Sequence, residues 1–136
     1  MEHKKIKIKK DYEKWHRQKT AIDHSQAPRV FYHEREMWWC TLGVNIGFEQ
    51  DGSGEEYRRP VLILRGLSNE TCFVAPLTTA TSNHELRPSI GLVEGKEARV
   101  LLSQIRVIDT KRLVRKLGYL EHGIFQQIRK KAKDIL

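Results

Sequence analysis

A polar stretch with three glycines, residues 47–60, carries the side chains best suited to chemistry. It lies between two apolar segments and ends in an arginine–proline step, at Arg59 and Pro60. Polar loops of this length inside a small domain are more often functional than incidental. Arginine suits an anionic group such as a phosphate, because its planar guanidinium presents several donors in a fixed geometry. The structural alternative is that Arg59 caps strand edges or pairs with Glu55 or Glu56.

A second polar stretch, residues 78–88, follows the next apolar segment and begins with the hydroxyl residues Thr78, Thr79, Thr81 and Ser82. Thr78 ends an apolar strand, so its hydroxyl could reach a phosphate bound beside Arg59. A threonine hydroxyl is a poor base without help, so we assign it a hydrogen-bonding role. The alternative is a threonine that only favours a turn. Thr79 would take its place if the register differed by one residue.

Short apolar and aromatic segments around these stretches predict strands, joined by polar turns and by a hairpin at residues 94–96. A helical turn is expected at 109–113. The C-terminal segment predicts an amphipathic helix with Ile124, Phe125, Ile128, Ala132 and Ile135 on its apolar face. The pattern predicts a mainly β (α+β) fold, a small curled antiparallel sheet or barrel with a closing helix. The expected strands are 36–44, 60–64, 71–77, 89–93, 98–102 and 105–108.

The first 34 residues differ from the remainder, and we expect a basic arm followed by a helix packed on the main body. Residues 1–10 are rich in lysine. Asp11 could cap a helix with Tyr12, Trp15 and Ile22 on one face, ending before Pro28. Residues 35–136 would form the main domain, and 136 residues suit a single domain overall.

The composition argues against a membrane protein, a metalloprotein or a cofactor enzyme. No apolar run approaches the roughly 20 residues that span a bilayer, and no apolar segment follows the charged N-terminus. We therefore expect a cytoplasmic protein. Cys40 and Cys72 are expected to be buried, reduced thiols. The six histidines are not spaced in the sequence as metal ligands usually are. Neither a metal nor a cofactor is expected.

The net charge of +8 is unevenly distributed along the chain. Counting Lys, Arg, Asp and Glu gives +4 for residues 1–37, −2 for 38–110 and +6 for 111–136. Positive ends around a slightly acidic middle suit a polyanionic partner, either a nucleic acid or an acidic protein segment. The alternative is a charge excess that only keeps the protein soluble.

Four segments in order resemble the PemK/MazF toxin family of type II toxin–antitoxin systems. They are Arg35-Glu36-Met37-Trp38-Trp39 with Leu42-Gly43; Gly47-Phe48-Glu49-Gln50 with Arg59-Pro60-Val61-Leu62; Val74-Ala75-Pro76-Leu77-Thr78; and residues 100–109 with Lys111-Arg112-Leu113. The resemblance covers residues 35–136. It implies an SH3-like barrel that dimerises and acts as a metal-independent, sequence-specific endoribonuclease, an mRNA interferase. Its partners would be single-stranded RNA, a small acidic antitoxin and, through the toxin–antitoxin complex, operator DNA.

The resemblance also implies roles for individual residues. Arg59 and Thr78 match the family's catalytic arginine and hydroxyl, and Glu49 is a further carboxylate candidate, which could instead hold Arg59 or bind a base. Candidate RNA contacts by stacking, hydrogen bonding or charge are Phe48, Gln50, Tyr57, Arg58, Thr79 and Arg87. Gln104 and Arg106 would support the site or the dimer, or form a polar network in the sheet.

The chain departs from one branch of the family, in which an arginine and an aspartate form an acid–base pair before the conserved glutamine. Leu101 and Ser103 stand at those positions. This departure leaves two alternatives open. The domain could be a non-catalytic binding module for protein or DNA, or an inactive family member that acts through its partner.

Overall fold

The computed structural model describes residues 30–42, 58–81 and 84–135. Seven strands, one α-helix and two short 3-10 helices follow one another in this part of the chain. The predicted N-terminal helix lies outside the described residues. The strands are β1 (Glu36–Thr41), β2 (Arg58–Gly66), β3 (Thr71–Thr78), β4 (Ser89–Val93), β5 (Lys96–Val100), β6 (Arg106–Asp109) and β7 (Leu113–Tyr119).

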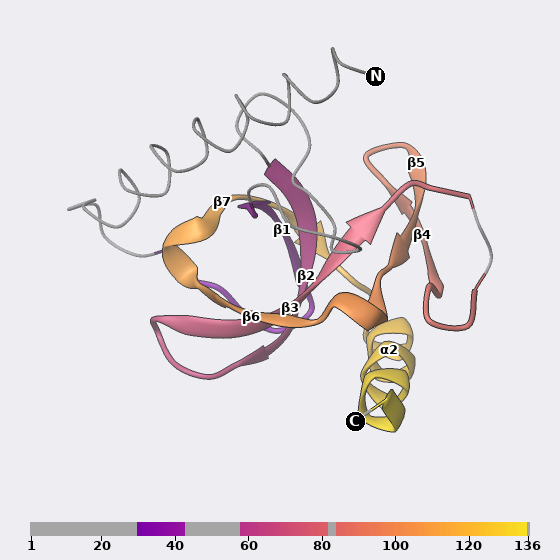
Figure 1. The fold of residues 1–136 in the computed structure, drawn as a ribbon. Coiled ribbons are helices and arrows are strands. Elements are labelled where there is room, and N and C mark those ends of the chain that lie inside the picture. Colours follow the sequence, from indigo (N-terminus) through magenta and orange to yellow (C-terminus); the bar gives the residue numbers. More distant parts are fainter. Residues whose placement is uncertain (1–29, 43–57, 82–83, 136) are drawn as a thin grey trace, which may run out of the picture.

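The strands form one strongly curled antiparallel sheet in the order β4-β5-β3-β2-β1-β7. One edge of β3 pairs with β2, while its other edge pairs with β6 over residues 71–74 and with β5 at Leu77 and Thr78. Figure 1 shows β7, β1, β2, β3 and β6 curving around one side of the molecule, with the β4–β5 hairpin on the other. The predicted curled antiparallel sheet with a C-terminal helix is therefore confirmed.

Successive side chains of a strand point to opposite faces of the sheet, and one apolar cluster lies on each face. Trp38, Val61 and Ile63 belong to the cluster enclosed by the curl. Their neighbours Met37 and Leu62 belong to the second cluster, on the opposite face. Both faces are thus buried along the central strands, which explains why β1, β2 and β3 are nearly continuous apolar runs.

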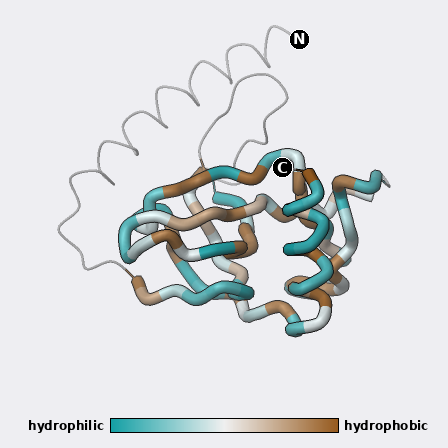
Figure 2. Tube along the Cα trace, turned by 90° about the horizontal axis from the view of Figure 1, so that it is seen from below, coloured by the Kyte–Doolittle hydropathy of each residue, from teal (hydrophilic) through white to brown (hydrophobic). Residues whose placement is uncertain are grey.

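The helix α2 (His122–Ile135) covers the second cluster. The carboxylate of Glu121 accepts hydrogen bonds from the amides of Gly123 and Ile124, at 2.8 and 2.9 Å, and so caps the first turn. Phe125, Ile128 and Ala132 are buried, and in Figure 2 hydrophilic and hydrophobic residues alternate along the helix. Ile135, predicted on the same apolar face, is 41% exposed in the last turn.

The turns follow their sequence signals closely. Glu94 and Gly95 form a two-residue hairpin turn with φ of 50° and 81°, a turn that favours glycine at its second position. Asp109 caps the 3-10 helix Thr110–Arg112 by accepting a 2.8 Å hydrogen bond from the Lys111 amide, as the predicted helical turn requires. A further strand predicted through Leu102 ends at Val100, and a 3-10 helix (Leu102–Gln104) follows.

Candidate functional site

A pocket of about 610 Å³ lies where the ends of β2 and β3 meet the β4–β5 turn. Side chains from six strands, from the β4–β5 turn and from the segment after β3 line it. They are Trp39, Arg59, Pro60, Leu77, Thr78, Thr79, Ala80, Val93, Glu94, Lys96, Ala98 and Leu117. Three residues selected from the sequence, Arg59, Thr78 and Thr79, thus come together at one pocket.

Arg59 lies 18 positions before Leu77, the residue that precedes Thr78. The register of β2 against β3 explains why Arg59 and Thr78 nevertheless line one pocket. Val61 of β2 pairs with Pro76 of β3 in an antiparallel ladder. Continuing that register by two residues on each strand brings Arg59 opposite Thr78. Arg59 is half-buried, and its Nη1 donates a 3.1 Å hydrogen bond to the carbonyl oxygen of Leu77.

Thr78 is half-buried at the end of β3, and its side chain is already oriented by a local contact. Its Oγ1 accepts a 3.2 Å hydrogen bond from the amide of Ala80. A threonine hydroxyl can accept one hydrogen bond while it donates another, so this contact leaves the hydroxyl proton for a second acceptor. Thr79, the next residue, is exposed and lines the same pocket.

The remaining predicted site residues separate into two groups. Phe48, Glu49, Gln50 and Tyr57 lie outside the described residues. Arg58, Arg87, Gln104 and Arg106 are half-buried, and none of them lines the pocket. Arg58 begins β2 opposite Thr41, and Arg106 lies in β6 opposite Val74.

Residues that sequence reasoning did not select complete the pocket walls. Trp39 comes from β1, Glu94 from the β4–β5 turn and Lys96 from the start of β5. Glu94 Oε1 pairs with Arg115 Nη2 of β7 at 3.8 Å. The hairpin signal at 94–96 was visible in the sequence, but only the pairing of β5 with the end of β3 brings that turn beside Thr78.

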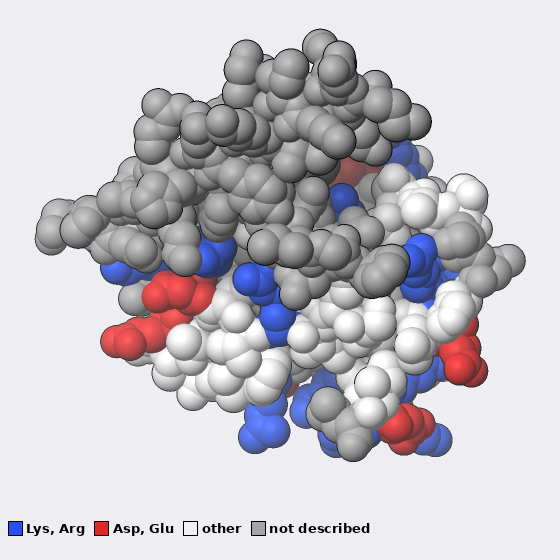
Figure 3. All heavy atoms as spheres, in the orientation of Figure 1, with Lys and Arg blue, Asp and Glu red and all other residues white. Residues whose placement is uncertain are grey.

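Among the described residues, the charged side chains that line the pocket are Arg59, Lys96 and Glu94, two positive and one negative. Figure 3 shows basic side chains spread over the described surface of one face, with acidic side chains in a few separate groups. Within the described ranges, no three His, Cys, Asp or Glu side chains gather closely enough to hold a metal ion. None of the helices there is long and apolar enough to cross a membrane.

The pocket can bind a phosphate between the Arg59 guanidinium and the Thr78 hydroxyl. Arginine donates to phosphate oxygens in fixed directions, and a neighbouring hydroxyl can add a hydrogen bond to the same group.

Comparisons with known proteins agree with the fold. Residues 33–136 match the family model described as PemK-like, MazF-like toxin of type II toxin–antitoxin system. A search of curated proteins found no match.

Solved structures share the fold at low sequence identity. MazF from Deinococcus radiodurans is 19% identical, with a TM-score of 0.63 over 78% of this chain and 96% of that one. The Mycobacterium tuberculosis toxin MazF-mt6 is 21% identical, with a TM-score of 0.55 over 74% and 97%. A mycobacterial endoribonuclease in complex with its cognate antitoxin is 15% identical, with a TM-score of 0.55 over 79% and 93%.

Proposed function

The chain belongs to the family of PemK-like and MazF-like toxins of type II toxin–antitoxin systems, and from this premise we propose that it is an endoribonuclease. Its substrate is single-stranded mRNA, which it cleaves sequence-specifically and without a metal ion. The observation that supports this most directly is the pocket shared by Arg59 and Thr78. Both were selected from the sequence, and they come from separate strands.

The proposed reaction is attack by a ribose 2′-hydroxyl on the adjacent phosphate, giving a 2′,3′-cyclic phosphate and a 5′-hydroxyl. Negative charge builds on the non-bridging phosphate oxygens, so donors aimed at them lower the barrier. Arg59 supplies such donors, and the Thr78 hydroxyl hydrogen-bonds the phosphate or the proton in transfer. Glu49 is our candidate carboxylate for proton transfer from the 2′-hydroxyl.

The proposed partners follow from the family and from charge. We propose a cognate antitoxin, small and acidic, which the net charge of +8 favours. A mycobacterial endoribonuclease of this fold has been solved with its cognate antitoxin. The toxin itself is proposed to be a cytoplasmic homodimer, and operator DNA would be contacted through the toxin–antitoxin complex.

Incubating the purified chain with a mixed RNA transcript in EDTA tests the proposal. Discrete fragments with cyclic-phosphate ends are expected from the wild type and not from Arg59→Ala. Arg65→Ala is the matched control, because Arg65 is an exposed arginine of the same strand and does not line the pocket. RNA that stays intact while the chain co-purifies tightly with a protein would contradict the proposal and favour the non-catalytic binding module.

A further inference from the structure

Two consecutive tryptophans of β1 have opposite environments. Trp38 points into the cluster enclosed by the curl, where its Nε1 donates a 3.1 Å hydrogen bond to Glu36 Oε1. Trp39 is half-buried on the other side of the strand and lines the pocket that contains Arg59 and Thr78. Its Nε1 is also buried, but among the described residues it has no hydrogen-bond partner.

A buried N–H without an acceptor destabilises the folded chain, and most buried polar groups in proteins are paired. A phenylalanine at position 39 would pack an aromatic ring against the same neighbours without this cost. An acceptor that arrives with a ligand and displaces the atoms that cover the indole nitrogen would remove this cost.

The position of Trp39 identifies the ligand. Trp39 lines the same pocket as Arg59, which is the residue next to Pro60, the partner of Trp39 in the β1–β2 ladder. An acceptor that reaches Trp39 from the pocket therefore belongs to a group beside whatever Arg59 binds. If Arg59 binds the scissile phosphate, that group is the nucleotide attached to the phosphate.

We propose that Trp39 is a substrate-binding residue whose indole N–H donates a hydrogen bond to an oxygen of the RNA next to the cleaved phosphate. This inference rests on the proposed ribonuclease function. The acceptor is a base carbonyl or a non-bridging phosphate oxygen, and the indole face adds a surface for base stacking.

The test compares Trp39→Phe with Trp38→Phe in binding to single-stranded 2′-O-methyl RNA oligonucleotides of random sequence, which lack the attacking 2′-hydroxyl and so are not cleaved. Trp39→Phe keeps an aromatic ring and removes the donor, so RNA affinity is expected to fall about tenfold. Its melting temperature is expected to stay level or rise, because an unpaired donor is removed. Trp38→Phe is expected to do the reverse, lowering the melting temperature by breaking the Glu36 contact and leaving RNA affinity unchanged.

Binding of a second set of oligonucleotides, varied one base at a time, distinguishes the two acceptors. A base acceptor predicts that Trp39→Phe relaxes specificity at one position, whereas a phosphate acceptor predicts a uniform loss for all sequences. Trp39→Phe that binds RNA as the wild type does would overturn this inference and leave the ribonuclease proposal standing. A wild-type chain that binds no RNA would overturn both.

A measurement on the wild-type chain does not depend on the variants' folding. The sequence has three tryptophans, so an ¹⁵N-labelled sample gives three indole resonances, which Trp15→Phe and Trp38→Phe assign by difference. The same 2′-O-methyl RNA is expected to shift the Trp39 indole proton downfield as it acquires an acceptor, while the Trp38 signal stays in place. An unmoved Trp39 signal at saturating RNA would contradict the proposal.

Discussion

Arg59 Nη1 donates a 3.1 Å hydrogen bond to the carbonyl oxygen of Leu77, the residue immediately before Thr78. This contact joins the start of β2 to the end of β3 through a side chain, just beyond Val61 and Pro76, the last pair of the β2–β3 ladder. The guanidinium is therefore oriented by the strand that also carries Thr78. The placement of the Arg59 guanidinium relative to the Thr78 hydroxyl therefore depends on two paired strands, which are more rigid than a loop.

Arg59→Lys is predicted to reduce RNA cleavage by about a hundredfold, since losing one preorganised donor to a developing charge has effects of that size. Lysine retains the charge but lacks the planar fork, so it cannot contact the Leu77 carbonyl and a phosphate in the same geometry. Single-turnover cleavage rates measure the effect, with Arg65→Lys as the control. Wild-type rates in Arg59→Lys would show that only charge matters at this position.

Thr78→Ser is predicted to retain most cleavage activity, while Thr78→Ala loses about tenfold, a loss expected when one hydrogen bond of about 1–1.5 kcal/mol is removed. Serine keeps the hydroxyl that accepts from the Ala80 amide at 3.2 Å. Thr79→Ala in the same assay tests the register. A larger loss in Thr79→Ala than in Thr78→Ala would transfer the proposed role to Thr79.

Sequence patterns predicted the central elements well because their side chains face two cores. β1, β2 and β3 are short apolar runs, and their turns carry specific signals, such as the Ser68 hydroxyl that accepts from the amides of Glu70 and Thr71. β7 was missed because Arg115, Lys116 and Gly118 interrupt its apolar residues. Only Leu113 is buried in that strand, and its pairing with β1 is interrupted by two register shifts.

Part of the pocket lining was predicted from the sequence and part was not. Arg59 and Thr78 follow apolar strands that are adjacent along the chain, so their proximity could be anticipated. Trp39 could not be separated from Trp38 by residue type, since both suit a buried strand. Their difference depends on which face each occupies and on whether Glu36 is within reach.

Cys40 and Cys72 are predicted to react with thiol reagents only after the chain unfolds. Both side chains are fully buried, and burial raises the pKa of the Cys40 thiol to about 12 and that of Cys72 to about 11. The reactive thiolate is therefore scarce at pH 8, in addition to being inaccessible. Labelling followed across a urea titration should coincide with the unfolding curve. Rapid labelling of the folded chain would contradict the buried positions of both cysteines.

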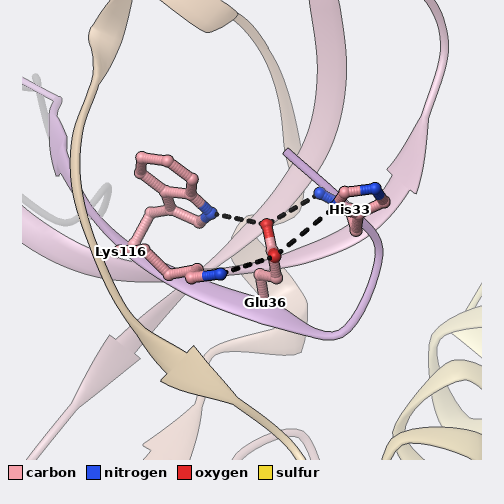
Figure 4. A network of polar contacts seen from close by, with 4 residues as sticks. His33, Glu36 and Lys116 are labelled. Carbon is pink, nitrogen blue, oxygen red and sulfur yellow. Dashed lines mark hydrogen bonds and ion pairs between the residues drawn. The ribbon is translucent and has the colours of Figure 1, made fainter. Parts of the chain in front are cut away.

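The carboxylate of Glu36 connects three segments on one side of the sheet (Figure 4). It accepts hydrogen bonds from the His33 amide at 2.7 Å, from Trp38 Nε1 at 3.1 Å and from Lys116 Nζ at 3.3 Å. Burial by itself would raise the pKa of Glu36. The hydrogen bonds and the positive charge of Lys116 outweigh burial and hold the pKa below the ordinary value of 4.5.

This depressed pKa predicts a specific acid sensitivity. A carboxyl with a lower pKa in the folded than in the unfolded chain stabilises the fold above pH 4.5, and that contribution is lost as pH falls through the folded pKa. Glu36→Gln is therefore expected to lower the free energy of unfolding by about 1–3 kcal/mol at pH 7, with a smaller deficit at pH 2–3. Urea titrations at each pH measure this, with exposed Glu85→Gln as the control. A deficit that is equal at both pH values would mean that shape, and not charge, determines the role of Glu36.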